Sequence, residues 1–413
     1  MGLVQNYILV HDDTEVKMGR SFIRRALLVV VGNFLLVGSA AAQGVPRLDS
    51  YEGVAVRILQ SNNAGTIQHV IDPTTNEVTG LIRGCPNPHN LTSHPDGLYY
   101  YCANEREHTV DVFDTKTLKL VEQIRLSQRP NKVAVNKKHR KIYAGISRRS
   151  ATPGPGVEVD PDAGLPALVD VIDIDTHKLI KSIEVHDPVH NVFMTPDEKF
   201  VVAGLRGEVG PGIPTLQVID PNTDTVIWGM ELTGYEQYGR THHEVRPMAF
   251  EAGDDGTTKR MYAQATGINA VWVIDWDKRE VVDMLWPPEL PLWEKNADGI
   301  QSGDMHGLEV LPDRSAVWAS SRLDSRIYGW SLPDFDYIGS VKVGPSANWI
   351  TSTPDSRYMY VAVSGSDHTL AVDLQSLEIV AKIKTGARPA RISTVILPPD
   401  RVNPTGTNMR SEE

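Results

Sequence analysis

The 413-residue sequence contains only two cysteines, and neither lies in a Cys-x-x-Cys-His arrangement, so it has no site for covalent haem attachment. It also lacks a Gly-x-Ser-x-Gly elbow and a glycine-rich phosphate loop, which argues against a serine hydrolase of that type and against a bound nucleotide. Positive charge is scarce as well, because 41 Lys and Arg residues stand against 52 Asp and Glu residues, a net charge of −11. Nucleic acid is therefore not an expected partner.

A long hydrophobic run is missing too. The N-terminal apolar run, Ala26 to Gly38, is about 13 residues long, too short to cross a bilayer comfortably. A basic stretch, Met18 to Arg25, precedes it, and the small residues Ser39 to Ala42 follow. This order predicts a signal peptide over residues 1–42, a periplasmic or secreted mature protein and no stable membrane insertion. An uncleaved anchor is the alternative, and the polar residues 1–17 leave open a true start at Met18.

Glycine and proline are abundant, at 33 and 27 residues, which indicates many turns and therefore many short strands. The decisive feature is an internal repeat. Seven segments share a small or proline-containing start, a short apolar strand and often a Pro-Asp turn: Pro88–Gly97, Pro130–Asn136, Val189–Asp197, Pro247–Ala252, Met305–Asp313, Ala347–Asp355 and Pro389–Thr394. Their second residues are 42, 59, 58, 58, 42 and 42 positions apart, as expected for a 42-residue unit with three enlarged copies.

Each unit continues in the same way. A second strand such as Tyr358–Val363 is followed by a third that ends in Asp, such as Leu216–Asp220, and by an alternating fourth, such as Ile338–Val343. Period-2 alternation with β-branched and aromatic residues predicts strands, and four antiparallel strands at this period form a propeller blade. The sequence thus predicts an all-β, seven-bladed β-propeller over residues 43–400, with a polar tail at 401–413.

Second strands that read Tyr-Val-Ala or Tyr-Cys-Ala-Asn, with Val-Ile-Asp in the third strand, resemble the YVTN β-propeller repeat family. The resemblance covers roughly residues 54 to 398. It implies the fold and does not imply an activity.

The two ends of the repeat complement each other. Pro389–Ile396 reads as a first strand without partners after it, whereas Val54–Leu59 and Thr66–Arg83 supply later strands that lack a first one. We therefore expect the N- and C-terminal strands to share one blade, which closes the ring and leaves no open edge between the first and last blades. We expect a monomer.

Cys85 and Cys102 both fall in one predicted blade, with Cys102 in a strand and Cys85 in the preceding loop. In an oxidising compartment they could form a disulfide, although the loop position does not guarantee the geometry. The alternative is two buried thiols.

The longest insertions identify a working face. In an up-and-down blade, the loop into the first strand and the loop between the second and third strands emerge on the same side. All the long insertions fall in these loops: Ser147–Pro166, Arg206–Pro214, Tyr235–Val245 and Trp286–Met305. Long loops on a rigid scaffold are where binding residues tend to lie, so we expect this face to surround the mouth of the central channel.

Histidine recurs at one repeat position on this face. The position holds His89, Asn131, His190, Met248, His306, Asn348 and Ala390. Imidazole is a common metal ligand, so His89, His190 and His306 are candidate ligands of one copper, zinc or iron ion, with His242 or His243 as a further ligand. The alternative is that these histidines pack between blades and bind loop backbone.

Other polar residues could join the site. Arg129, Arg246 and Arg388 precede first strands and are candidates for binding a carboxylate or phosphate, or for pairing with loops. Asn131 and Asn348 are candidate substrate ligands from the histidine position. Trp349 could belong to an aromatic wall or simply pack. Glu244 is the candidate acid or base, although a solvated loop carboxylate is the alternative.

Two functions of different classes follow. In the first, the protein is an extracytoplasmic enzyme that binds one metal ion at the channel mouth and acts on a small molecule by redox, lyase or hydrolytic chemistry. In the second, it is a non-catalytic propeller that holds a protein, peptide or glycan on its loop face. Propellers host both classes, so the fold alone does not choose between them.

Overall fold

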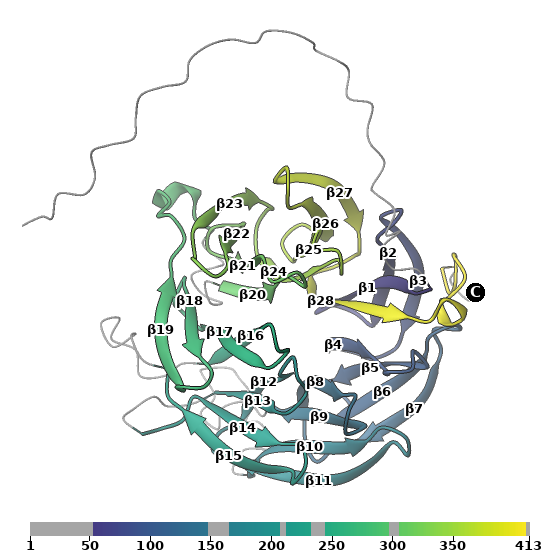
Figure 1. Ribbon diagram of the computed structural model, residues 1–413. Helices are drawn as coiled ribbons and strands as arrows, with labels where there is room; N and C mark the ends of the chain where they lie inside the picture. The colour runs from purple at the N-terminus through teal and green to yellow at the C-terminus, as the bar shows by residue number, and fades with distance from the viewer. Residues whose placement is uncertain (1–52, 148–164, 207–211, 233–243, 297–304, 410–413) are drawn as a thin grey trace, which may run out of the picture. The chain divides into compact units, whose positions relative to one another are not determined.

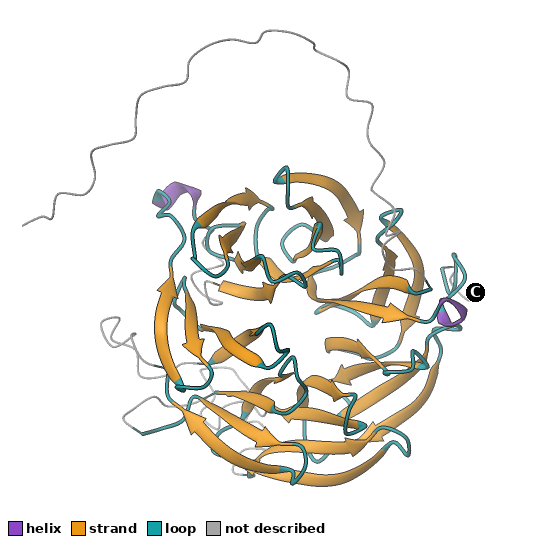
Figure 2. Cartoon of the chain, in the orientation of Figure 1, coloured by secondary structure: helices purple, strands orange, loops and turns teal. Residues whose placement is uncertain are grey.

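The computed structural model describes residues 53–147, 165–206, 212–232, 244–296 and 305–409. These residues belong to one compact unit, and nearly all their regular structure is β-strand (Figure 2). The only helices described are two single 3-10 turns, η2 (Leu292–Glu294) and η3 (Pro399–Arg401). No helix in the described ranges is both long and apolar enough to span a membrane.

The strands form seven antiparallel four-stranded sheets, which confirms the predicted seven-bladed propeller (Figure 1). Blade 1 contains β28 (Pro389–Leu397), β1 (Ala55–Asn62), β2 (Ile67–Asp72) and β3 (Glu77–Arg83). Blade 2 contains β4 (Pro88–Ser93), β5 (Tyr99–Asn104), β6 (Thr109–Asp114) and β7 (Leu120–Arg125). Blade 3 contains β8 (Pro130–Asn136), β9 (Lys141–Ile146), β10 (Ala167–Asp173) and β11 (Lys178–Val185).

The remaining blades repeat this order. Blade 4 contains β12 (Val189–Met194), β13 (Val201–Leu205), β14 (Leu216–Asp220) and β15 (Thr225–Met230). Blade 5 contains β16 (Val245–Ala252), β17 (Thr258–Ala265), β18 (Val271–Asp275) and β19 (Glu280–Leu285). Blade 6 contains β20 (Met305–Val310), β21 (Ala316–Ser321), β22 (Arg326–Ser331) and β23 (Tyr337–Lys342). Blade 7 contains β24 (Ala347–Ser352), β25 (Tyr358–Val363), β26 (His368–Asp373) and β27 (Glu378–Lys384).

The ring closes as predicted. Strand β28 pairs with β1 along its whole length, from Ala55 opposite Leu397 to Asn62 opposite Pro389. Side chains then join this blade to its neighbours, because Ser393 Oγ donates to the Leu91 carbonyl in blade 2 at 2.7 Å. Each inner strand contacts the inner strand of the next blade around the ring. The first and last blades are therefore joined in the same way as the other neighbouring blades, by packing of their inner strands.

The core is divided among the blade interfaces. Seven clusters of buried apolar side chains are described, and each combines residues of two neighbouring blades. The cluster between blades 4 and 5, for example, packs Val202 and Leu216 against Met261 and Trp272. The outermost strands are the least buried, as Val121 on β7 and Ile180 on β11 show. The three inner strands of each blade are therefore mostly buried, and the outermost strand is the one most exposed to solvent.

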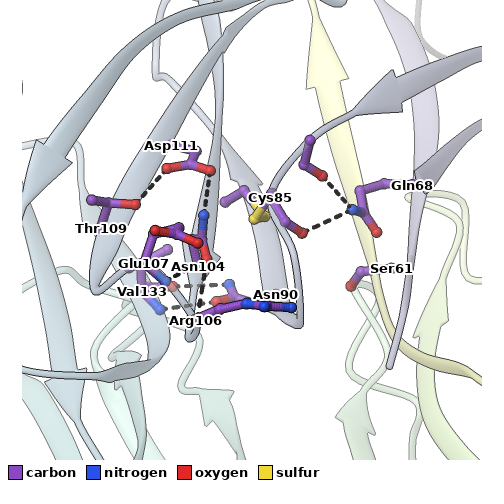
Figure 3. Close-up of a disulfide and its surroundings, with 12 residues drawn as sticks. Ser61, Gln68, Cys85, Asn90, Asn104, Arg106, Glu107, Thr109, Asp111 and Val133 are labelled. Carbon is purple, nitrogen blue, oxygen red and sulfur yellow. Dashed lines mark hydrogen bonds between the residues drawn. A yellow bond between two sulfur atoms is a disulfide. The ribbon is translucent and has the colours of Figure 1, made fainter. Parts of the chain in front are cut away.

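Two features reinforce blade 1, where the chain ends meet. Cys85, in the connection from β3 to β4, forms a disulfide with Cys102 on β5, with their Cα atoms 6.5 Å apart (Figure 3). The segment after β28 also returns to β3, because the Leu81 amide donates to the Thr407 carbonyl at 3.0 Å. Asn403, which is buried in the same segment, donates from its side chain to the Thr79 carbonyl.

Candidate functional site

Every inner strand carries a β-bulge at its start. In each blade the first paired residue is followed by an extra residue that has no counterpart on the second strand. In each blade one residue directly follows the first paired residue of the inner strand. These seven residues are His89, Asn131, His190, Arg246, His306, Asn348 and Ala390. A bulge bends the strand and re-aims its side chain, and bulges occur preferentially at barrel rims and beside active sites. The repeated histidine position is therefore a bulge at the channel mouth.

The predicted alignment was wrong in blade 5. Val245 pairs with Ala265 and Met248 pairs with Ala263, so Arg246 rather than Met248 follows the first paired residue. Met248 instead corresponds to Leu91, which pairs with Cys102 in blade 2, and both side chains are buried. The reason is physical: this inner strand begins two residues earlier than its proline suggests.

A second repeat position adds charged groups that the sequence analysis missed. The residue directly after each second strand lies beside the start of the first strand, as the Arg206 amide shows by donating to the Pro188 carbonyl at 2.8 Å. This position holds Glu105, Ser147, Arg206, Thr266, Arg322 and Ser364 in blades 2 to 7. Aligning the repeats at the ends of their second strands would have found Glu105, Arg206 and Arg322. Nothing in the repeat pattern singles out Arg391.

The turn after β5 positions Glu105. The Asn104 side chain accepts hydrogen bonds from the amides of Arg106 and Glu107, at 3.2 and 3.0 Å (Figure 3). Its amide group donates to Asp111 Oδ2 at 2.7 Å, which fixes the side chain against the neighbouring strand. Because Asn104 satisfies both amides of the tight turn, the Glu105 carboxylate is directed inward, where its side chain is only 6% exposed.

His89 is fully engaged by its neighbours. Its Nδ1 lies 2.6 Å from Glu105 Oε1, and its Nε2 accepts a hydrogen bond from Arg391 Nη2 at 2.8 Å. Since a guanidinium can only donate, Nε2 carries the lone pair and Nδ1 carries the proton donated to Glu105. Burial lowers the pKa of His89 to about 4, so the ring is neutral. Arg129 and Asn87 also bind the Glu105 carboxylate.

His190 has a similar carboxylate but a free nitrogen. Its Nδ1 is bonded to Glu244 Oε1, and Arg206 Nη2 lies 3.2 Å from the same nitrogen. Glu244 also pairs with Arg206 at 2.7 Å and with Arg246 at 2.9 Å, while Thr266 donates to it at 3.2 Å. The shorter Glu244 contact assigns the proton to Nδ1, so that Nε2 is a buried acceptor with no partner among the described residues. Burial lowers the pKa of His190 to about 3.

His306 completes the set of three histidines. Its ring lies 6.2 Å from the Trp349 ring, and its Nδ1 is buried without a partner in the described part of the chain. Burial lowers the pKa of His306 well below its usual value, with Arg322 and Arg391 acting in the same direction. The His89 and His190 rings meet edge to face at 5.9 Å between centroids. All three rings are therefore neutral at pH 7.

The two carboxylates are ionised. Burial by itself raises the pKa of Glu105, but His89 and Arg129 together hold it below the usual range. Burial likewise opposes ionisation of Glu244, and His190 and Arg206 more than compensate, so that its pKa lies well below the usual value. Glu244 is thus a part-buried carboxylate bound by two arginines and a histidine, and not a solvated loop residue.

Positive charge nevertheless exceeds negative charge at the mouth. Among the described residues, the guanidinium groups within electrostatic reach of one another and of the two carboxylates are those of Arg129, Arg206, Arg246, Arg322 and Arg391, and the exposed Arg388 also acts on Arg322. The described guanidinium groups of this cluster therefore outnumber its two carboxylates, in a protein whose net charge is −11. Burial, followed by Arg246, lowers the pKa of Arg391 to about 9, which expresses the cost of crowding these cations.

The other candidate ligands divide into two groups. Asn348 belongs to the cluster, because its Oδ1 accepts from Arg391 Nη1 at 3.2 Å. Asn131 is fully buried, and neither atom of its side-chain amide has a partner among the described residues. Arg388 does not join the cluster through a hydrogen bond: its side chain is exposed and its backbone amide binds Asp367. Trp349 lies deeper, stacked on Phe193.

The metal site stays a prediction. In the described ranges no three His, Cys, Asp or Glu side chains are arranged to hold a metal ion. Binding through His89 Nε2 would also have to displace the Arg391 guanidinium. His242 and His243 lie outside the described residues, so the structure does not test a site that includes them.

The fold is shared with solved structures of low sequence identity. Hydrazine synthase from Kuenenia stuttgartiensis superposes with a TM-score of 0.52 at 17% identity, covering 74% of this chain and 88% of that one. The β-propeller domain of Cps50 (Swd1) from Myceliophteria thermophila gives 0.53 at 11% identity, with coverages of 72% and 85%. The chain is a propeller. At these identities the likeness extends to the fold alone, and each protein's function is its own.

No family model and no curated protein matches the sequence. The resemblance to YVTN repeats therefore stays a prediction.

Proposed function

We propose that this protein binds a small organic anion at the channel mouth, through a carboxylate or phosphate group held by the arginine cluster. The observation that carries the proposal is that guanidinium groups outnumber carboxylates among the described residues there, in a chain that is acidic overall. Guanidinium groups form paired, charge-assisted hydrogen bonds with planar carboxylates and with phosphates, and crowded buried cations are stabilised by a counter-anion.

The ligand of this proposal also carries hydroxyl groups. Buried polar atoms without partners are rare in native proteins, yet His190 Nε2, His306 Nδ1 and the whole Asn131 amide are of this kind in the described part of the chain. All three residues occupy the bulge position, so they belong to one rim. His190 Nε2 is an acceptor and would receive a ligand O–H, while the Asn131 amide can both donate and accept.

We also propose that the protein works outside the cytoplasm. The Cys85–Cys102 disulfide is typical of an oxidising compartment, and the N-terminal segment has the composition of a signal peptide. A periplasmic or secreted binding protein would meet small anions in solution, and the acidic remainder of its surface would leave the channel mouth as the attractive point.

Ligand titration tests this proposal. L-malate, glycerol and inorganic phosphate are each titrated at constant ionic strength while the melting temperature and the heat of binding are measured. We expect malate to bind saturably and glycerol not to bind, because glycerol has hydroxyl groups without a charge. Comparing phosphate with malate shows whether the arginine cluster prefers a phosphate group or a carboxylate. The absence of any saturable anion effect would refute the proposal.

Matched arginine variants locate the site. Arg206→Gln combined with Arg246→Gln should weaken malate binding at least about tenfold, because each good charge-assisted contact contributes about 1.5 to 3 kcal/mol. Arg140→Gln is the control, since Arg140 lies in the turn between β8 and β9, on the other face, and pairs with Asp175 in the turn between β10 and β11. Equal weakening in both variants would place binding elsewhere.

A metal ion is the second candidate. The free nitrogens of His190 and His306 favour it, since imidazole nitrogens are good ligands for copper, zinc or iron. Elemental analysis of protein purified without a histidine tag tests it, with His190→Ala and His306→Ala as variants. Near-zero metal in every sample after loading would reject this candidate and leave anion binding unaffected.

The loop face also carries a feature that suits a larger partner. Leu292 and Trp293 of η2 are 76% and 85% exposed, on the connection from blade 5 to blade 6. Exposed aromatic and aliphatic side chains of this kind are typical of contact surfaces for proteins or glycans. A protein, peptide or glycan held there would be a binding function without catalysis, and Trp293→Ala would weaken it without changing malate binding.

A further inference from the structure

A separate cavity lies deeper in the channel. It has a volume of about 220 Å³ and is lined by residues of five inner strands, β4, β8, β12, β24 and β28. Lys132, Phe193, Trp349 and Arg391 contribute the large side chains of its wall. Arg391 belongs both to this wall and to the arginine cluster at the mouth, so the cavity adjoins the proposed anion site.

Lys132 reaches into an aromatic sandwich. The Phe193 and Trp349 rings are nearly parallel, 4° apart in plane and 6.1 Å apart between centroids. The Lys132 Nζ lies 3.3 Å from the Phe193 centroid and 4.5 Å from the Trp349 centroid. Across the described residues this nitrogen forms no hydrogen bond and no ion pair. Its close contacts are the faces of the two aromatic rings.

This setting favours the neutral amine. Burial lowers the pKa of Lys132 well below its usual value, and the Arg391 cation lowers it further. Glu309 on β20 acts in the opposite direction, but burial raises its own pKa to about 7, so it is only partly ionised at neutral pH. A lysine that is desolvated and next to another cation is the usual form of an amine nucleophile.

We propose that Lys132 is a nucleophilic amine that forms an imine with small aldehydes entering the channel. The lone pair on Nζ attacks the carbonyl carbon, and the oxygen leaves as water with the two protons that Nζ loses, so that amine and aldehyde give imine and water. Arg391, whose guanidinium carbon is 5.4 Å from the Trp349 ring, favours an aldehyde that also carries a carboxylate. This inference does not depend on anion binding at the mouth.

Reductive trapping tests the inference. The whole protein is incubated near pH 7 with a limiting amount of glyoxylate and with cyanoborohydride, which supplies the hydride that reduces the imine to a secondary amine. Peptide mapping by mass spectrometry then gives the modified fraction of each lysine. We expect Lys132 to react at least about tenfold faster than Lys278, whose side chain is 64% exposed and hydrated.

Two comparisons keep the result interpretable. Acetaldehyde in place of glyoxylate should still modify Lys132 first, but more slowly, since it lacks the carboxylate. The Lys132→Arg variant keeps a long polar side chain beside the two rings but has no nucleophilic amine, and it should lose the fast-reacting site without losing its circular dichroism. If that variant does not fold, the wild-type peptide map alone decides. Modification of Lys132 no faster than of Lys278 would overturn the proposal and leave the lysine a structural cation.

Discussion

Replacing Glu244 tests the charge balance of the channel mouth most directly. Its side chain is 18% exposed and is bound by Arg206, Arg246 and His190. Glu244→Gln removes one of the two carboxylates described in the cluster, so the local positive charge rises by one. Breaking a buried ion pair from one side costs about 3 to 5 kcal/mol because the partner charge stays buried. Glutamine keeps the size of glutamate and some of its hydrogen bonds. We therefore expect the free energy of unfolding to fall by about 3 kcal/mol, the lower end of this range.

The assay is the free energy of unfolding from denaturant titration. Glu280→Gln is the matched control: Glu280 is on the outer strand β19, its side chain is 58% exposed and it lies 3.9 Å from Lys278. An exposed pair of this kind contributes up to about 1 kcal/mol, so the control should stay close to wild type. Equal effects of the two substitutions would refute the charge argument.

Chemical rescue sharpens the same prediction. Glu244→Ala leaves space for a small carboxylate, and added formate should restore up to about 2.7 kcal/mol at a concentration of about 100 times its dissociation constant. Glu244→Gln should recover less, because the amide fills that space. Chloride at equal ionic strength is the control. Recovery by chloride that equals recovery by formate would show that screening, and not occupation of the site, explains the effect.

Three further outcomes test the fold and the cavity. Leu397→Ala on the closing strand should cost about 2 to 5 kcal/mol of unfolding free energy, whereas Ile396→Ala, which is 47% exposed on the same strand, should cost far less; similar losses would argue against closure by this strand. Burial raises the pKa of Glu309 from 4.5 to about 7, so its contribution to stability is present at low pH and is lost as pH rises through about 7. Glu309→Gln should therefore gain about 2 to 3 kcal/mol relative to wild type between pH 5 and pH 8 in urea titrations, and a flat difference would contradict the assigned shift. Replacing Cys85 and Cys102 together by Ala should cost about 3 kcal/mol, the closure entropy of a loop with a separation of 17 residues, and a change below about 0.5 kcal/mol would show that the reduced chain is already constrained there.

The sequence by itself determined the architecture, because the patterns that specify strands and turns are local and recur in every repeat. Strand periodicity and the spacing of Pro-Asp turns depend on neighbouring residues, so they predicted seven blades, four strands in each and closure by the chain ends. The same repeat predicts that the long insertions share one face, since loop order in an up-and-down sheet decides on which side a loop emerges; most residues of these insertions lie outside the described ranges. It also brought forward His89, His190 and Glu244, which the structure places at the channel mouth.

Tertiary structure decided what these residues contact. Arg391 binds His89 across 302 positions of sequence, because ring closure brings the last strand beside the second blade. The bulge register placed Arg246 where Met248 was expected, since pairing with the second strand, and not the position of the proline, sets where the strand begins. Glu105 became a partner of His89, and Arg206 a partner of Glu244, only because each second strand ends beside a first strand. A local pattern can specify a strand, but charge balance at a channel depends on which strands the closed ring brings together.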